Sequence, residues 1–168
     1  MANVEFHDYR VKVKGALEDA CISYLYEAAG ELEAQTARNS SNEKYGLNTA
    51  QNLWKHAVDE SAKVATVGSP HEAAFWEEFG TGEYALNGDG RKGWWVYIEG
   101  GSGYNGPTNK YNSREEAEAA AAFISAKHNV RAVATNGREP NRPLHRAFTS
   151  LKSKLKRMAE QVIGGGMK

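Results

Sequence analysis

The chain begins and ends with two long segments whose apolar residues recur at helical spacing. From Ala16 to Ala37, one apolar stripe advances by three or four positions at a time, as on one face of an α-helix. The segment from Leu144 to Val162 repeats this spacing. We therefore expect long helices near both ends, and a core that contains the large residues of the two stripes, Leu25, Leu32, Phe148, Leu151 and Leu155.

Alternating apolar and polar residues predict extended structure in two further places. The segment from Val4 to Val13 alternates loosely and predicts a short strand or an extended arm. Trp54 to Val67 predicts two strands joined by a turn at Asp59-Glu60-Ser61. The preceding segment, Asn39 to Asn52, is rich in Asn, Ser and Gly, which is typical of a loop.

The stretch from Ala73 to Gly93 is the one around which we expect the fold to be organised. It opens with residues that favour a short helix. We expect Phe79-Gly80-Thr81-Gly82 to end that helix in a structural turn, because glycine adopts positive φ without a Cβ clash. At least one of the two glycines should therefore have a positive φ. Phe79 should point inward, and Thr81 should hydrogen-bond the backbone.

An insertion is predicted after this turn. Glu83 to Asn112 is rich in glycine, tryptophan and tyrosine, and Trp94-Trp95-Val96-Tyr97-Ile98 has the composition of a strand. Ser113 and Glu116 have the spacing of a capping box, which begins an alanine-rich helix. A further strand is predicted over residues 130–134. These elements form an inserted β-α-β region.

The elements together predict an α+β fold in a single domain, residues 1–168. We expect a small, mostly antiparallel sheet against which the long N-terminal and C-terminal helices pack. Its core should lie within residues 4–82 and 130–163, and the insertion should cover residues 83–129. The glycines that begin at Gly164 should end the last helix and leave residues 164–168 as a flexible tail.

The composition is that of an ordinary globular protein with balanced charge. Lys and Arg together number 21, as do Asp and Glu, so the formal net charge is zero. This argues against a free-standing nucleic-acid-binding protein, which usually carries excess positive charge, but leaves room for a local basic patch. The single cysteine fits a reducing compartment. Without a signal peptide or an apolar run of about 20 residues, the chain is expected to be made and used in a cytoplasm.

Candidate catalytic residues do not combine into a site. Glu77 and Glu78 are neighbours on a helix and therefore do not face each other. The five histidines are scattered, without metal-ligand spacing. Gly88 to Gly93 is glycine-rich but lacks the Lys and Ser/Thr of a phosphate-binding loop. Cys21 lies on the apolar stripe, where a buried structural role is the simpler interpretation. We therefore expect no enzyme, cofactor, metal or small-molecule substrate.

The aromatic residues of the insertion are candidates for binding. Adjacent side chains on a strand point to opposite faces, so either Trp94 or Trp95 can fill the core while the other is exposed. An exposed Trp can anchor a protein interface or stack on a sugar or a base. Burial, a protein interface and ligand stacking all remain open. The candidate interface residues in this region are Arg91, Trp94, Trp95, Tyr97 and Tyr104.

The two long helices carry opposite charge. The first is acidic on its polar side, and the last is basic, with Glu160 its only acid. Such faces can lie together within one chain, meet between subunits in a heterologous contact that closes a ring, or remain solvated. The basic face is also able to contact DNA phosphates without reading sequence. The candidate interface residues here are Arg142, Arg146, Lys152, Lys154 and Lys156.

Two segments resemble a protein family. The run Glu78-Phe79-Gly80-Thr81-Gly82 resembles the signature of the tail-completion, or neck, proteins that form the head–tail connector of long-tailed bacteriophages. In that family, a proline followed by apolar and small residues opens the last helix, and Arg142-Pro143-Leu144-His145-Arg146-Ala147-Phe148 is similar. The resemblance covers the first helix, Gly68 to Gly82, and Arg142 to Val162.

The resemblance implies a structural virion protein at the head–tail junction, present in the host cytoplasm during assembly. It implies a homo-oligomeric ring around the DNA channel, with other connector and tail proteins as partners and non-specific DNA contact possible. Neither a membrane nor a small molecule is an implied partner. The alternative is a small binding module whose Trp- and Tyr-rich region stacks on carbohydrate or single-stranded nucleic acid.

Overall fold

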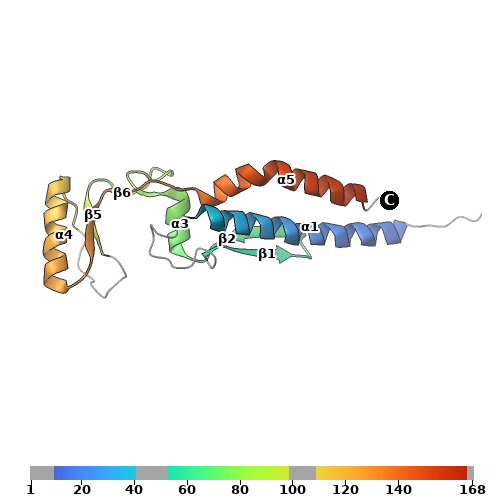
Figure 1. Ribbon diagram of the computed structural model, residues 1–168, viewed down its shortest axis with the longest axis horizontal. Helices are drawn as coiled ribbons and strands as arrows, with labels where there is room; N and C mark the ends of the chain where they lie inside the picture. The colour runs from blue at the N-terminus through green and yellow to red at the C-terminus, as the bar shows by residue number, and fades with distance from the viewer. Residues whose placement is uncertain (1–9, 41–52, 99–108, 166–168) are drawn as a thin grey trace, which may run out of the picture. The chain divides into compact units, whose positions relative to one another are not determined.

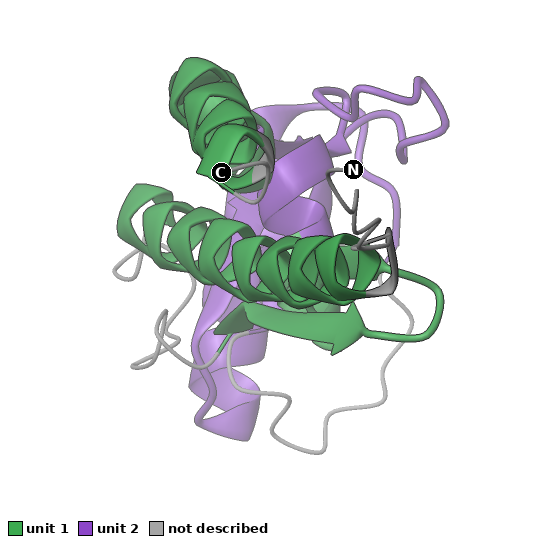
Figure 2. Cartoon of the chain, turned by 90° about the vertical axis from the view of Figure 1, so that its right-hand side faces the viewer, with its two compact units in different colours: residues 1–74, 143–168 green, residues 75–142 purple. Residues whose placement is uncertain are grey.

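The computed structural model describes residues 10–40, 53–98 and 109–165, and the chain divides into two compact units (Figure 2). Unit 1 comprises residues 1–74 and 143–168, and unit 2 comprises residues 75–142. The described residues form an α+β fold with long helices near both ends of the chain (Figure 1). The predicted fold class is confirmed. Within the described residues, however, the strands form three two-stranded sheets, not a single small sheet.

Two long antiparallel helices form the frame of unit 1. Helix α1 spans Arg10–Asn39, and helix α5 spans Pro143–Gly165. The end of α1 lies beside the start of α5, because the Asn39 side-chain amide donates to the Pro143 carbonyl at 3.1 Å. Further along both helices, the Tyr24 hydroxyl donates to the Leu155 carbonyl at 3.1 Å. These two contacts fix the antiparallel arrangement.

Both helices extend beyond their predicted limits. Helix α1 already includes residues 10–13, so the strand or extended arm predicted there is wrong for that part of the segment. Adding a turn to an existing helix is cheap, and Arg and Lys are good helix formers, which outweighs the short alternation of valines. Helix α5 includes Gly164 and Gly165, two residues of the predicted tail. Residues 4–9, 41–52 and 166–168, which carry other predictions, lie outside the described residues.

A β-hairpin packs on the other side of α1. Strands β1 (Lys55–Asp59) and β2 (Val64–Gly68) pair antiparallel, as predicted from the sequence. Helix α1 lies between this hairpin and α5 (Figure 2). The Glu33 carboxylate of α1 accepts from the His56 main-chain N–H at 2.7 Å and lies 2.6 Å from its ring Nδ1. A polar contact therefore helps to seat the hairpin on the helix.

The core of unit 1 lies near the start of α5 and not along the two apolar stripes. Leu53, Trp54 and Ala74 are buried together, and Leu144 packs against them. The Trp54 indole N–H donates to the Ser40 hydroxyl at 2.7 Å, so its polar atom is satisfied. The predicted core is wrong for Phe148, which is 49% exposed. The other predicted core residues are half-buried: Leu25, Leu32, Leu151 and Leu155.

The thin architecture of unit 1 explains this exposure. Helix α5 is covered along its length by α1, and one helix cannot cover the whole width of another helix's apolar stripe. The fully buried side chains of the two helices are small or medium-sized, among them Ala29 at 3% and Ala147 and Thr36 at 0% exposure. The larger apolar side chains of the stripes remain half-buried or exposed.

Unit 2 contains the predicted inserted β-α-β region. Strands β4 (Trp95–Ile98) and β5 (Ala132–Thr135) pair antiparallel, and helix α4 (Arg114–His128) packs against them. Val96 is 2% exposed, and Ala117 and Ala121 of α4 are also buried. Since β5 pairs with β4, it lies in the same unit as the insertion, although the sequence placed it in the core of the domain.

The predicted capping box of α4 is confirmed. The Ser113 hydroxyl accepts from the Glu116 N–H at 3.2 Å. The Glu116 carboxylate in turn accepts from the Asn112 N–H, one residue before the cap, at 3.1 Å. At the other end, Asn129 closes the helix in the left-handed conformation. Local sequence therefore determines both ends of this helix.

Candidate functional site

The predicted structural turn lies at the end of helix α3 (Glu72–Phe79). Both of its glycines have positive φ, 74° at Gly80 and 62° at Gly82, which confirms the prediction. Thr81 and Gly82 form the short strand β3, which pairs with β6 (Gly137–Arg138). A Cβ added at Gly82 would collide with the Asn136 carbonyl oxygen and lie 2.5 Å from the Trp95 ring. Glycine is therefore required here by both conformation and space.

A distant segment holds the last turn of α3. The Glu77 carbonyl accepts from the Asn141 main-chain N–H at 2.9 Å and from the Arg142 N–H at 3.2 Å. The Glu77 carboxylate also accepts from the Asn141 side-chain amide at 2.7 Å. Glu77 is 1% exposed, so the carboxylate is a buried structural acceptor. This fits the interpretation that Glu77 and Glu78 are structural and not a catalytic pair.

Helix α3 buries its acids and exposes its aromatic residues. Glu77 and Glu78 are 1% and 8% exposed. The aromatic residues on the other side of the helix are 36–53% exposed: Phe75, Trp76 and Phe79. The expectation that Phe79 points inward is therefore wrong. The contact with Asn141 explains the difference, because it turns the acidic side of α3 toward the protein.

The exposed side chains gather into a patch beside the turn. The rings of Phe75 and Phe79, one helical turn apart, lie 4.8 Å from each other between centroids. The backbone of Leu86 adjoins that of Phe79, since the Leu86 N–H donates to the Phe79 carbonyl at 2.9 Å, and the Leu86 side chain is 50% exposed. Tyr84, between the turn and Leu86, is 41% exposed. We call Phe75, Phe79, Tyr84 and Leu86 the turn patch.

Thr81 stabilises the turn through its main chain. Its carbonyl accepts from the Tyr84 N–H at 3.2 Å, and the residue pairs with Arg138 across β3 and β6. The Leu86 and Tyr84 hydrogen bonds together fold the chain after β3 back against the end of α3. The residues of the turn patch therefore lie on backbone that is held by main-chain hydrogen bonds.

The two tryptophans of the insertion are both half-buried and both stack with arginine. The Arg91 guanidinium lies 5.1 Å from the centroid of the Trp95 ring, and that of Arg114 lies 5.9 Å from the Trp94 ring. Each ring therefore has one face covered by a cation. Neither Trp is fully exposed, although the alternation of the strand allowed one of them to be. Tyr97 is the exposed aromatic of this strand, at 49%.

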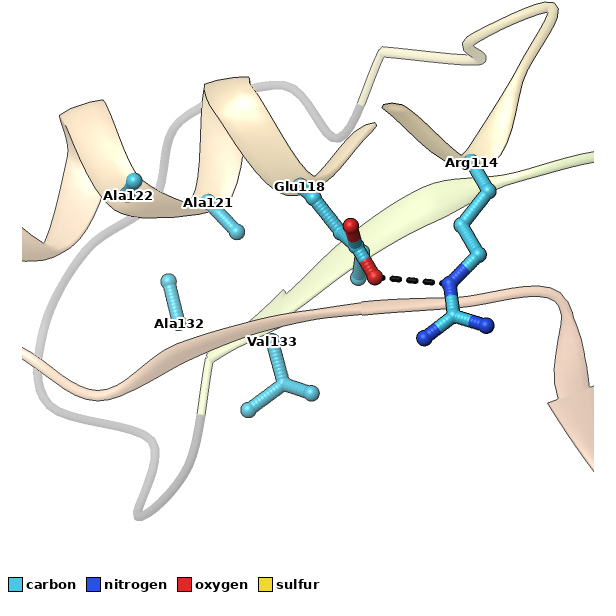
Figure 3. Close-up of a pocket in the computed structure, with 7 residues that line it drawn as sticks. Arg114, Glu118, Ala121, Ala122, Ala132 and Val133 are labelled. Carbon is cyan, nitrogen blue, oxygen red and sulfur yellow. Dashed lines mark hydrogen bonds and ion pairs between the residues drawn. The ribbon is translucent and has the colours of Figure 1, made fainter. Parts of the chain in front are cut away.

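Helix α4 and strand β5 line an open depression of about 390 Å³ (Figure 3). Its lining is mostly small and apolar, with alanines from both elements and Val133. Its charged groups are Arg114 and Glu118, which pair with each other at 2.6 Å. The hydrogen bond that Arg114 donates to the Glu118 carboxylate raises the pKa of Arg114 above its ordinary value. With its charges already paired, the depression offers a shallow surface for contact.

The candidate residues of α5 are exposed and differ in their contacts. Lys154 faces α1, where its ammonium lies 2.8 Å from the Glu31 carboxylate. The hydrogen bond and charge of Lys154 lower the pKa of Glu31. The Arg146 guanidinium donates to the Asn39 carbonyl at 2.7 Å. Lys156 lies 3.8 Å from Glu160 on its own helix, and Lys152 has no ion pair among the described residues.

The structure brings the candidate residues together in two separate groups. Arg91, Trp94, Trp95 and Tyr97 gather on and around β4 in unit 2. The cations from Arg146 onward lie along α5 in unit 1. Arg142 is half-buried, has a positive φ of 54°, and has an Nε without a hydrogen-bond partner. Tyr104 lies outside the described residues.

Sequence reasoning missed three exposed apolar positions. Leu86, Phe123 and Val133 are 50%, 64% and 40% exposed, respectively. The exposure of Phe123 could have been predicted from the sequence, because Phe123 lies on the polar side of the amphipathic helix α4. For Leu86, in an irregular segment, the sequence contains no periodicity that would reveal its exposure.

In the parts of the chain that the structure describes, there is no group of three His, Cys, Asp or Glu residues able to hold a metal ion. Among the same residues, no helix is long and apolar enough to cross a membrane. Comparison with models of protein families, with characterised proteins and with solved structures finds no match for this chain.

Proposed function

We propose that this chain is a structural protein of the neck of long-tailed bacteriophages. It joins or completes the tail at the head–tail interface, and it acts through protein–protein contacts, without catalysis. Copies of the chain form a ring around the DNA channel and touch other connector and tail proteins. The protein resides in the virion and passes through the host cytoplasm during assembly.

The observation that carries this proposal is the turn patch. Phe75, Phe79, Tyr84 and Leu86 are 36–53% exposed and lie around one turn of the backbone. Clustered exposed apolar side chains mark protein contact sites, whereas scattered ones are ordinary. Aromatic residues are enriched among the anchors of such sites because they bury a large area at small entropic cost.

The location of the patch links it to the resemblance described above. Phe79 belongs to both the turn patch and the run Glu78-Phe79-Gly80-Thr81-Gly82 that resembles the neck-protein signature. Within the run, Glu78 is buried and the two glycines have positive φ. The motif thus has a structural part, which shapes the turn, and an exposed part, which is available to a partner. This division supports an assembly role.

The proposal is tested in the bacteriophage whose genome encodes the protein. Deleting the gene should leave filled heads and tails that fail to join or to complete, visible by electron microscopy. The wild-type chain should be detected by mass spectrometry in purified tailed particles. Particles of normal morphology and infectivity without the gene would overturn the proposal, as would absence of the chain from purified particles.

A further inference from the structure

The outward side of α5 is rich in exposed cations. Four of the exposed side chains there are cationic, and the one exposed acid, Glu160, lies among them, 3.8 Å from the Lys156 ammonium. Lys154 is not part of this surface, because it pairs with Glu31 of α1 at 2.8 Å. We name the outward cations the α5 basic face: Arg146, Lys152, Lys156 and Arg157.

Helical geometry places these cations relative to the apolar stripe. Arg157 follows the stripe residue Leu155 by two positions, about 200° around the helix, so it points away from the stripe. Arg146 has the same position relative to Leu144, but its guanidinium reaches back to the end of α1 and donates to the Asn39 carbonyl at 2.7 Å. Lys152 and Lys156 directly follow the stripe residues Leu151 and Leu155, so both lie beside the apolar stripe on the same side of the helix. Ser153 stands between the cations and is also exposed, whereas the exposed Thr149 hydroxyl donates to the His145 carbonyl of the same helix at 2.8 Å.

The residue types distinguish between two classes of partner. The cores of protein interfaces are depleted in lysine and rich in aromatic residues. Phosphate groups are contacted by Arg and Lys and by the hydroxyls of Ser and Thr. The α5 basic face has the second composition, and its nearest large apolar residue, Phe148, lies at its border. The observations therefore favour a phosphate polyanion over a protein.

We infer that the α5 basic face binds the phosphate backbone of duplex DNA without reading its sequence. This inference rests on the proposed function for its biological setting, a chain that surrounds DNA, and it names the partner of this surface. The strength of binding comes from counterion release at the contacted phosphates. It requires no excess charge over the whole chain.

The dimensions of the face set the number of contacts. Arg146 and Arg157 are 11 positions apart in α5, which is about 16 Å along the helix axis. Duplex DNA carries one charge per about 1.7 Å of its axis, so phosphates are available along the whole face. Because Arg146 also donates to the Asn39 carbonyl, we expect three or four contacts. The binding constant should then fall with salt with a logarithmic slope of about −3 to −4.

The test measures binding of the full chain to a labelled duplex of about 20 base pairs by fluorescence anisotropy, between about 50 and 200 mM salt. The test variant is Lys152→Gln/Lys156→Gln/Arg157→Gln. The control variant, Lys55→Gln/Lys110→Gln/Lys127→Gln, removes the same charge from exposed positions outside α5. Circular dichroism and thermal unfolding establish that both variants are folded.

For the wild type and the control, the binding constant should fall with salt with the logarithmic slope of about −3 to −4. The test variant should bind about 10-fold or more weakly, with a slope nearer −1. Equal binding by the two variants would overturn the inference, as would no binding by the wild type at the lowest salt. Displacement of the duplex by inorganic phosphate at constant ionic strength would show an ion site and also overturn it.

Two further outcomes separate this inference from the proposed function. If the test variant changes the oligomeric state but not DNA binding, the face is a protein interface and the inference fails, while the proposed neck role stands. If the chain binds DNA as expected but is absent from tailed particles, the proposed function fails and the basic face remains a DNA-binding surface.

Discussion

Glu77 and Asn141 are 64 positions apart in the chain and contact each other twice. The Asn141 side-chain amide donates to the Glu77 carboxylate at 2.7 Å, and its main-chain N–H donates to the Glu77 carbonyl at 2.9 Å. The second bond, together with the one from the Arg142 N–H at 3.2 Å, satisfies a carbonyl in the last turn of α3. The pair therefore determines which side of α3 is buried and thereby exposes Phe75 and Phe79.

Replacing Asn141 tests this relationship. Asn141→Ala leaves the buried Glu77 carboxylate short of a donor and should lower the free energy of unfolding by about 1–3 kcal/mol. Asn141→Asp should cost more, because it places a second carboxylate against the first. Asn87→Ala, in an exposed turn, is the control and should be neutral. Urea unfolding followed by tryptophan fluorescence measures all three. An Asn141→Ala variant as stable as the control would contradict the role of the pair.

Two glycines with similar φ but different surroundings test the turn. Gly82 has φ 62° and no room for a Cβ, whereas Gly88 has φ 73° and open space. Gly88→Ala should therefore cost only the left-handed backbone strain, about 1–2 kcal/mol. Gly82→Ala adds a collision with the Asn136 carbonyl and should cost about 2–5 kcal/mol. Equal losses in thermal unfolding experiments would show that space at Gly82 is not limiting.

The position of the core in unit 1 predicts unequal effects of two aromatic truncations. Trp54 is 3% exposed and donates to Ser40, so Trp54→Ala should lower the free energy of unfolding by about 3–5 kcal/mol. Phe148 is 49% exposed, so Phe148→Ala should cost only about 1 kcal/mol. Chemical denaturation of the two variants compares them directly. The reverse order would place the core along the apolar stripe of α5.

Acid should weaken the contact between α1 and α5. Lys154 lowers the pKa of Glu31 in the folded chain. The contact therefore stabilises the fold above the unfolded-state pKa, about 4.3, and this contribution is lost as the pH falls through the folded-state pKa. The pair is partly exposed, so the contribution is about 0–1 kcal/mol.

The measurement compares Glu31→Gln with the wild type by thermal unfolding at several pH values. The variant should be slightly less stable at pH 7, and the difference should disappear in acid. Glu27→Gln removes an exposed carboxylate of the same helix that forms no ion pair among the described residues, and it serves as the control. If Glu31→Gln remained less stable than the wild type by the same amount at pH values below the carboxyl pKa range, the ion pair would be ruled out as the cause.

Features that depend on neighbouring residues could be predicted from the sequence. The Ser113–Glu116 capping box, the β1–β2 hairpin, and the left-handed glycines of the turn all follow from local rules and agree with the structure. The two long helices were also predictable, because their stripes are long enough for the period to be clear. The start of α1 was not, since Val11 and Val13 alternate as they would in a strand.

Features that depend on distant residues could not be predicted. Helix α3 contains three aromatic residues and two adjacent acids, and the hydrophobic pattern alone places the aromatics inside. The burial of Glu77 follows from Asn141, which no local pattern connects to it. Likewise, the arginine that stacks on Trp94 is Arg114, which comes from the start of helix α4, 20 positions further along the chain. The motif therefore located the candidate site in the sequence, whereas only the three-dimensional structure showed which of its side chains are exposed.

The most direct test of the central claim is whether the turn patch is required for the chain to enter tailed particles. The test variant, Phe75→Ser/Phe79→Ser/Leu86→Ser, changes exposed side chains and should remain folded, as judged by circular dichroism. Phe123→Ser is the matched control, because Phe123 is 64% exposed on α4, away from the turn. Each variant replaces the wild-type gene, and mass spectrometry measures the amount of the chain in purified particles. We predict normal incorporation of the control and loss of the test variant, with unjoined heads and tails; normal incorporation of a folded test variant would contradict the claim.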